Sequence, residues 1–131
     1  MKIGIYLVVL IFLFSCSEAS IRSGLKKYSW TVEEVVFEGI TYESFFFRVN
    51  TMSFKEGSSC KLPYFDWASN FQSEWYISNV RSNYFDLTLT NSDRNFLDGT
   101  YKSRMFYDDS LKLRILILEN ERLKLVCKSF P

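Results

Sequence analysis

Hydrophobic and polar residues alternate along most of the chain after residue 27. In residues 85–90, for example, Phe85, Leu87 and Leu89 are separated by aspartate and threonine. A repeat of two residues places neighbouring side chains on opposite faces of a β-strand, whereas an amphipathic helix would repeat every 3.6 residues. The pattern therefore predicts eight strands, at residues 28–38, 42–54, 59–64, 73–79, 84–90, 96–107, 111–118 and 122–129.

The segments between these strands are mostly short and polar, which is typical of an antiparallel meander. No helix of ten or more residues is predicted after residue 16, and residues 66–72 favour at most one helical turn. A meander of this length would leave two exposed edges unless the sheet closes on itself. We therefore predict an all-β domain at residues 28–131, an antiparallel meander of about eight strands that closes into a barrel.

The distribution of charge favours the same closure. Residues 28–47 contain four acidic residues and no basic one, whereas residues 122–128 contain three basic residues and no acidic one. Closing the barrel would place these two segments side by side. Opposite charges across a strand pair contribute about 0.2–1 kcal/mol each, so their sign supports the contact.

The first 15 residues are predicted to be a signal peptide. Lys2 is followed by twelve uncharged, mostly bulky residues at 3–14, and then by a serine. A positive start, an apolar stretch of about 7–15 residues and a small residue at the cut are typical of a secretory signal. The alternative, a transmembrane helix, needs about 20 apolar residues. Residues 16–27 are mostly polar and are interpreted as a short tether to the first strand.

A more specific motif lies at the expected cleavage site. Leu13-Phe14-Ser15-Cys16 resembles the lipobox of bacterial lipoproteins, in which a leucine and a small residue precede an invariant cysteine. The resemblance implies that Cys16 receives a diacylglyceryl thioether, becomes the mature N-terminus and anchors the chain to a membrane of the cell envelope. The alternative is that Cys16 is an ordinary residue of the signal segment or a free thiol.

The other two cysteines leave two interpretations open. An exported chain meets oxidising conditions in many bacteria, so Cys60 and Cys127 would be able to form a disulfide that closes a loop of about 67 residues. They would equally serve as buried free thiols that pack as small hydrophobic residues. Their spacing matches no metal-binding motif.

The strand pattern also carries a family resemblance. Trp30 near the start of the first strand, a tryptophan-containing strand at 73–77, a glycine-containing arm at 96–101 and a final hairpin at 115–127 resemble lipocalin-like domains of small envelope lipoproteins of Bacteroidetes-type bacteria. The resemblance implies a small β-barrel, in some members with an apolar ligand cavity.

Aromatic residues are the candidates for ligand binding. They make up 18% of the chain, and a cluster of them lies at residues 64–76. Such rings would stack on an apolar ligand at the mouth of the barrel. The alternative is that they fill the core or plug one end. The candidate residues are Trp30, Phe47, Tyr64, Trp67 and Trp75.

Basic residues near the C-terminus are the candidates for a docking surface. If the hairpin loops at 108–110 and 119–121 have three residues each, then Leu111, Leu113, Ile115 and Ile117 face inward and the bases stack on the outer surface. Such a surface would contact anionic lipid headgroups or an acidic partner, at roughly 1 kcal/mol per base. The alternative is an ordinary solvated face. The residues are Lys102, Arg104, Lys112, Arg114, Arg122, Lys124 and Lys128.

Composition excludes several kinds of chemistry. The 131 residues include no histidine, the commonest general base and metal ligand. The net charge of +1 gives no general attraction to nucleic acid. No phosphate-binding loop or metal-spaced cluster occurs, so we expect no catalytic residue, cofactor or metal. We therefore expect a membrane-anchored envelope lipoprotein that binds a small apolar ligand, or alternatively an accessory subunit that docks on an envelope protein.

Overall fold

The computed structural model describes residues 17–43, 50–63, 72–92 and 97–130. Residues 17–27 are helical, and residues 56–58 form the 3-10 helix η2 (Glu56–Ser58). The strands are β1 (Ser29–Phe37), β2 (Ile40–Glu43), β3 (Thr51–Phe54), β4 (Ser59–Lys61), β5 (Gln72–Arg81), β6 (Tyr84–Thr90), β7 (Gly99–Asp108), β8 (Leu113–Glu119) and β9 (Leu123–Phe130).

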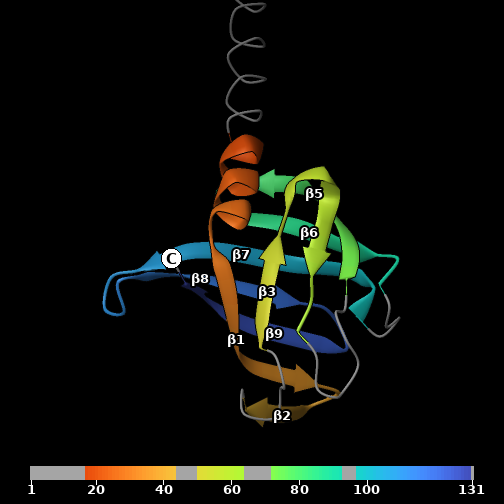
Figure 1. Cartoon of the computed structure of the whole chain (residues 1–131). Coiled ribbons are helices and arrows are strands. Elements are labelled where there is room, and N and C mark those ends of the chain that lie inside the picture. The colour runs from red at the N-terminus through yellow and green to blue at the C-terminus, as the bar shows by residue number, and fades with distance from the viewer. Residues whose placement is uncertain (1–16, 44–49, 64–71, 93–96, 131) are drawn as a thin grey trace, which may run out of the picture.

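The predicted closed barrel is confirmed. Eight strands, β1 and β3 to β9, form a ring of antiparallel neighbours, and β1 pairs with β9 to complete it (Figure 1). The charges expected to meet at this seam do so. Lys128 lies 4.0 Å from Glu33, and Arg122 lies 3.5 Å from Glu38. All four side chains are partly solvated, so these ion pairs contribute little to stability and serve mainly as evidence of the register.

The predicted strand at 42–54 is divided in the structure. β1 turns back into β2 through Glu38 and Gly39, both at positive φ, which is the backbone of a tight hairpin. β2 therefore pairs with the second half of β1, while β3 pairs with its first half at Trp30 and Thr31. As a result β2 lies outside the ring as a short edge strand beside β1. Residues 44–49 lie outside the described residues. So does the helical turn expected in residues 66–72, except for Gln72, which begins β5.

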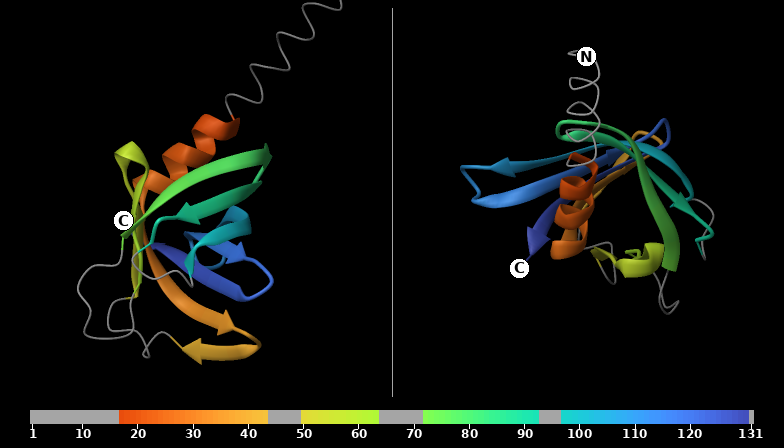
Figure 2. Two further views of the ribbon diagram at one scale, coloured as in Figure 1. Left: turned by 90° about the vertical axis from the view of Figure 1, so that its right-hand side faces the viewer. Right: turned by 90° about the horizontal axis from the view of Figure 1, so that it is seen from above.

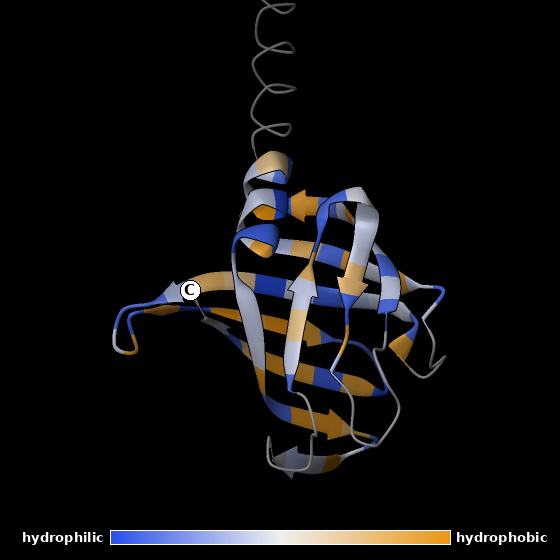
Figure 3. Ribbon diagram, in the orientation of Figure 1, coloured by the Kyte–Doolittle hydropathy of each residue, from blue (hydrophilic) through white to orange (hydrophobic). Residues whose placement is uncertain are grey.

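Alternate side chains from the strands fill the barrel. Phe85, Leu87 and Leu89 of β6 point inward, as their spacing predicts, and are at most 2% exposed. Met105 of β7 and Leu125 of β9 are also buried. Figure 3 shows hydrophobic residues recurring along the strands of the ring. Burying each such side chain contributes about 1.5–3 kcal/mol relative to leaving it exposed.

The predicted orientation of β8 is wrong. Leu116 and Leu118 are fully buried and face inward, whereas Leu111 is 50% exposed. The cause is loop length, because four residues rather than three separate the paired residues Asp108 and Leu113. The Asp108 carboxylate accepts hydrogen bonds from the backbone N–H groups of residues 110 and 111, which stabilises this longer turn.

The second hairpin has the same extra residue. Glu119 pairs with Lys124, so four residues lie between them. The Asn120 side chain accepts hydrogen bonds from the backbone N–H groups of Arg122 and Leu123. Because both loops are one residue longer than expected, β8 alone is turned over, while β7 and β9 keep their predicted faces.

The expectation that no long helix follows residue 16 is also wrong. The 11 described residues 17–27 are helical, where a tether was predicted. Ile21 and Leu25 are spaced one helical turn apart and are 5% and 0% exposed. The helix lies at one end of the barrel, beside the turn between β5 and β6 (Figure 2). We call this the helix-capped end. Whether it also links the domain to a membrane stays a prediction.

Candidate binding cleft at the helix-capped end

The N-terminal helix is docked tightly on the barrel. The Trp30 indole N–H donates a hydrogen bond to the Leu25 carbonyl at 3.1 Å, satisfying one of the free carbonyls at the end of the helix. At Gly24 the helix approaches so closely that an added Cβ would lie 2.6 Å from the terminal methyl of Met105. The glycine therefore permits this contact between helix and barrel.

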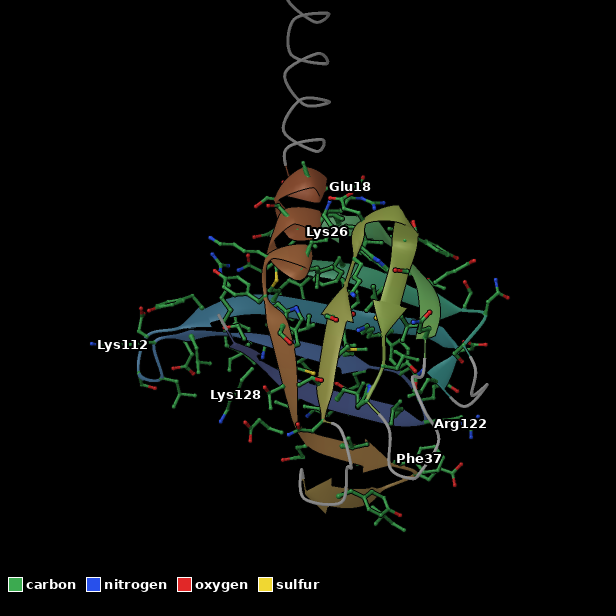
Figure 4. The ribbon with its side chains drawn as sticks, viewed as in Figure 1. Glu18, Lys26, Phe37, Lys112, Arg122 and Lys128 are labelled. Carbon is green, nitrogen blue, oxygen red and sulfur yellow. The ribbon has the colours of Figure 1, made fainter. Side chains whose placement is uncertain are left out.

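Charged side chains add contacts on the side of the helix that faces β3 and β5. Lys26 lies 2.8 Å from Glu56 of η2, and its hydrogen bond and charge hold the pKa of the Glu56 carboxyl below its ordinary value. Arg22 lies 5.6 Å from the centre of the Trp75 ring and pairs with Glu18, one turn earlier on the helix. Figure 4 shows Glu18 and Lys26 along this helix. The bases Arg22 and Lys26 are thus neutralised locally.

A cleft of about 520 Å³ lies on another side of the same helix. Residues from four separate segments border it: the helix, the β5–β6 turn, β7 and β8. Its lining comprises Ser17, Ser20, Ile21, Ser23, Gly24, Lys27, Tyr28, Ser82, Asn83, Met105 and Arg114. Among the described residues, the walls therefore present several hydroxyl groups, one amide and two positive charges, but no carboxylate.

Tyr28 brings the two positive charges of the cleft together. Lys27 lies 5.5 Å and Arg114 lies 5.9 Å from the centre of its ring, within the range of cation–π attraction. A hydrogen bond from Arg114 and the nearby charge of Lys27 lower the pKa of the Tyr28 hydroxyl. Neither cation forms an ion pair with any carboxylate of the residues that the structure describes. The cleft therefore suits a small anionic group.

The orientation of β8 places Arg114 in this cleft. Its backbone N–H donates a hydrogen bond to the Ser129 hydroxyl at 2.9 Å, which fixes the start of β8 against the end of β9. The sequence assigned Arg114 to the outer surface and did not single out Lys27 or Tyr28. No local signal identifies this site, because it depends on the loop lengths and on the docked helix.

The predicted ligand-binding residues lie elsewhere. Trp30 is fully buried and Trp75 is 2% exposed, and both belong to the core. The Trp75 indole N–H donates to the Lys55 carbonyl at 3.2 Å, so both indoles support the backbone around the helix-capped end. Neither lines the cleft. Phe47, Tyr64 and Trp67 lie outside the described residues, and a ligand site there stays a prediction.

The two internal cysteines are buried free thiols in the structure, which is one of the two predicted interpretations. Burial raises the pKa of Cys60 to about 12. Burial, with smaller contributions from Cys60 and Glu33, also raises the pKa of Cys127. Both side chains therefore stay protonated and unreactive at neutral pH. Cys16 lies outside the described residues, and its lipidation stays a prediction.

The predicted stack of seven bases is wrong as a continuous surface. Lys102, Arg104, Lys124 and Lys128 do lie on the outer surface of β7 and β9, but the turned β8 places Glu119 between Lys102 and Lys124. With Asp86 of β6 paired to Lys102, this row alternates in charge.

The remaining bases lie apart from this outer row. Lys112 is in the β7–β8 loop and Arg122 is in the β8–β9 turn, where it contacts Glu38 and lies 5.6 Å from the centre of the Phe37 ring. Figure 4 shows Lys112 and Arg122 on opposite sides of the molecule. With Arg114 in the cleft, only part of the predicted basic surface is assembled.

Comparison with known proteins gives no match: no family model, no curated protein and no solved structure matches this chain. The resemblance to lipocalin-like envelope lipoproteins therefore stays a prediction. Within the described ranges, no helix is both long and apolar enough to cross a lipid bilayer. The same residues contain no cluster of three or more potential metal ligands.

Proposed function

We propose that this protein is a lipid-anchored, non-catalytic binding module of a bacterial cell envelope. The lipobox-like residues 13–16 support the anchor. The observation that carries the proposal is that residues 17–27, directly after the expected anchor, are helical and dock beside a cationic cleft on a closed barrel. The expected site of lipid attachment and the candidate binding cleft are therefore connected by one helix.

The chemistry of the cleft favours binding over catalysis. Of the lining residues that the structure describes, Lys27, Tyr28 and Arg114 are titratable, and none is a carboxylate or imidazole that would act as a general base in the usual way. Two cations beside hydroxyl donors favour an anionic, polar ligand. The apolar ligand predicted from the aromatic residues, among them Phe47, Tyr64 and Trp67, stays a separate prediction.

Purification of the chain from its own cells tests the anchor. We expect the protein in the membrane fraction, and mass spectrometry of the intact chain should show loss of residues 1–15 and lipid on Cys16. The variant Cys16→Ser should appear in the soluble fraction or remain unprocessed. An unmodified Cys16 in a chain recovered from the soluble fraction would refute the proposal.

One observation favours the alternative of an accessory subunit. β2 is the end strand of the described sheet, pairing with β1 alone, and Ile40 on it is 58% exposed. An end strand offers unpaired backbone groups to a strand of another protein. If β2 is an interface, native electrophoresis of envelope extracts should show a complex that the variant Ile40→Asp reduces to the free chain. The same complex in both samples would argue against this surface.

A further inference from the structure

We propose that the cleft at the helix-capped end receives the phosphate group of an anionic membrane lipid, and that this end of the barrel faces the bilayer. The inference rests on the proposed lipid anchor, because attachment at Cys16 is what brings the cleft to the membrane surface. It adds the orientation of the domain and the chemical class of the ligand.

The distance from the anchor to the cleft is the first support. Ser17 lines the cleft and directly follows Cys16, and consecutive Cα atoms are about 3.8 Å apart. The headgroup layer on each side of a bilayer is about 5–8 Å thick. Because Ile21, Leu25 and Gly24 hold the helix against the barrel, little slack remains. A lipid on Cys16 would therefore hold the cleft at the level of the headgroups.

The charge of the helix-capped end is the second support. Without Lys2 the chain has equal numbers of basic and acidic residues, 15 of each. The helix-capped end comprises the helix, η2 with the residue before it, the cleft and the adjoining end of β5. Its acidic residues, Glu18 and Glu56, are outnumbered by a larger basic set. That set is Arg22, Lys26, Lys27, Lys55, Arg81 and Arg114. An anionic bilayer attracts such a surface, by about fivefold in binding for each well-placed base.

The two bases in the cleft differ from the other bases of the helix in their ion pairing. Arg22 and Lys26 are paired with Glu18 and Glu56, whereas Lys27 and Arg114 converge on Tyr28 without a described acidic partner. A phosphate oxygen between them would accept charge-assisted hydrogen bonds. Further hydrogen-bond donors border the same space, namely the hydroxyls of Ser20, Ser23 and Ser82 and the amide of Asn83.

The experiment uses the chain purified from its own cells and reconstituted in vesicles. One preparation contains phosphatidylcholine alone, and the other an equimolar mixture with phosphatidylglycerol. Hydrogen exchange followed by mass spectrometry reports on residues 17–28. If phosphatidylglycerol occupies the cleft, it stabilises the docked helix, and exchange should slow by about tenfold in the mixed vesicles. Equal exchange in the two preparations overturns the proposal.

Matched variants locate the effect. Lys27→Gln combined with Arg114→Gln should abolish the difference between the two vesicle types. Arg22→Gln combined with Lys26→Gln removes the same number of charges from the same helix, outside the cleft, and should retain most of the difference. An equal loss in both variants would show general charge attraction and overturn the cleft assignment. If the double variant does not fold, molar salt provides the test in the unmodified chain, because it reduces the screening length to about 3 Å and should also abolish the difference.

Two further experiments distinguish a lipid phosphate from free phosphate, and failure of the anchor from failure of the cleft assignment. Inorganic phosphate added to phosphatidylcholine vesicles should leave the exchange unchanged, and equal protection by free phosphate would overturn the lipid assignment. If mass spectrometry finds Cys16 unmodified, the proposed anchor fails. The thiol is then coupled to a maleimide-bearing lipid and the vesicle comparison is repeated. Cleft protection in that arm supports the cleft assignment independently, and its absence overturns it.

Discussion

Truncating Leu25 to alanine tests whether the N-terminal helix is an integral part of the domain. Leu25 is fully buried, and its carbonyl accepts the indole N–H of Trp30. Leu→Ala substitutions at buried positions cost about 2–5 kcal/mol, and the cost falls where neighbours relax into the space. Met105, which lies against the adjacent Gly24, has a flexible side chain that would fill part of the cavity. We therefore expect a loss of about 3 kcal/mol in the free energy of unfolding.

Urea denaturation of the purified chain measures this loss as a lower midpoint at an unchanged slope. The matched control is Ser23→Ala on the same helix. Ser23 is exposed, so its substitution should change the stability by less than about 0.5 kcal/mol. If Leu25→Ala lies within the same limit, the helix contributes nothing to the fold, and neither the docked helix nor the proposed position of the cleft at the headgroups holds.

Two further predictions concern pH and the outer surface. The pKa values of Cys60 and Tyr101 are raised by burial to about 12, from ordinary values of 9.0 and 10.0. Their contribution to stability is therefore complete below pH 9 and is lost as the pH rises to 12, because the unfolded chain ionises first. Urea midpoints across this window should fall, and a constant midpoint would contradict the burial of these groups. On the outer surface, Glu119→Lys places a third positive charge between Lys102 and Lys124, which should lower stability by up to about 1 kcal/mol at low salt and less at high salt. Glu121→Lys, in the neighbouring turn, is the control, and an equal effect would show that the register is wrong.

The strands and their closure were predictable because they depend on local periodicity and on charge. β6 matches the predicted limits of 84–90, and its apolar residues alternate without interruption. The pairing of β1 with β9 followed from opposite charges at residues such as Glu33 and Lys128, which do meet. Period-two alternation specifies which residues share a face of a strand, and here it also specified most of the buried core.

The face of β8 was not predictable, because the centre of this strand is apolar on both faces. Residues 115 and 117 are isoleucine and residues 116 and 118 are leucine, so either orientation would bury two large aliphatic side chains. The turn alone decides between the two faces, and the side chains of Asp108 and Asn120 stabilise a length that the pattern does not reveal. The helix was missed for a related reason. Its segment has few large apolar residues, and its stability comes from packing on the barrel rather than from its own propensity.

The pairing of β1 with β9 has a consequence for how the chain acquires its structure. These strands lie at opposite ends of the barrel sequence, so their contacts close the longest loop in the domain. Translation delivers the N-terminal strand first, yet its partner, residues 123–130, is delivered last. Until then the edges of β1 and β8 that pair with this strand have no neighbour, and a chain that stalls before residue 123 would expose them to other polypeptides. Folding of this domain is therefore completed only after its final strand emerges.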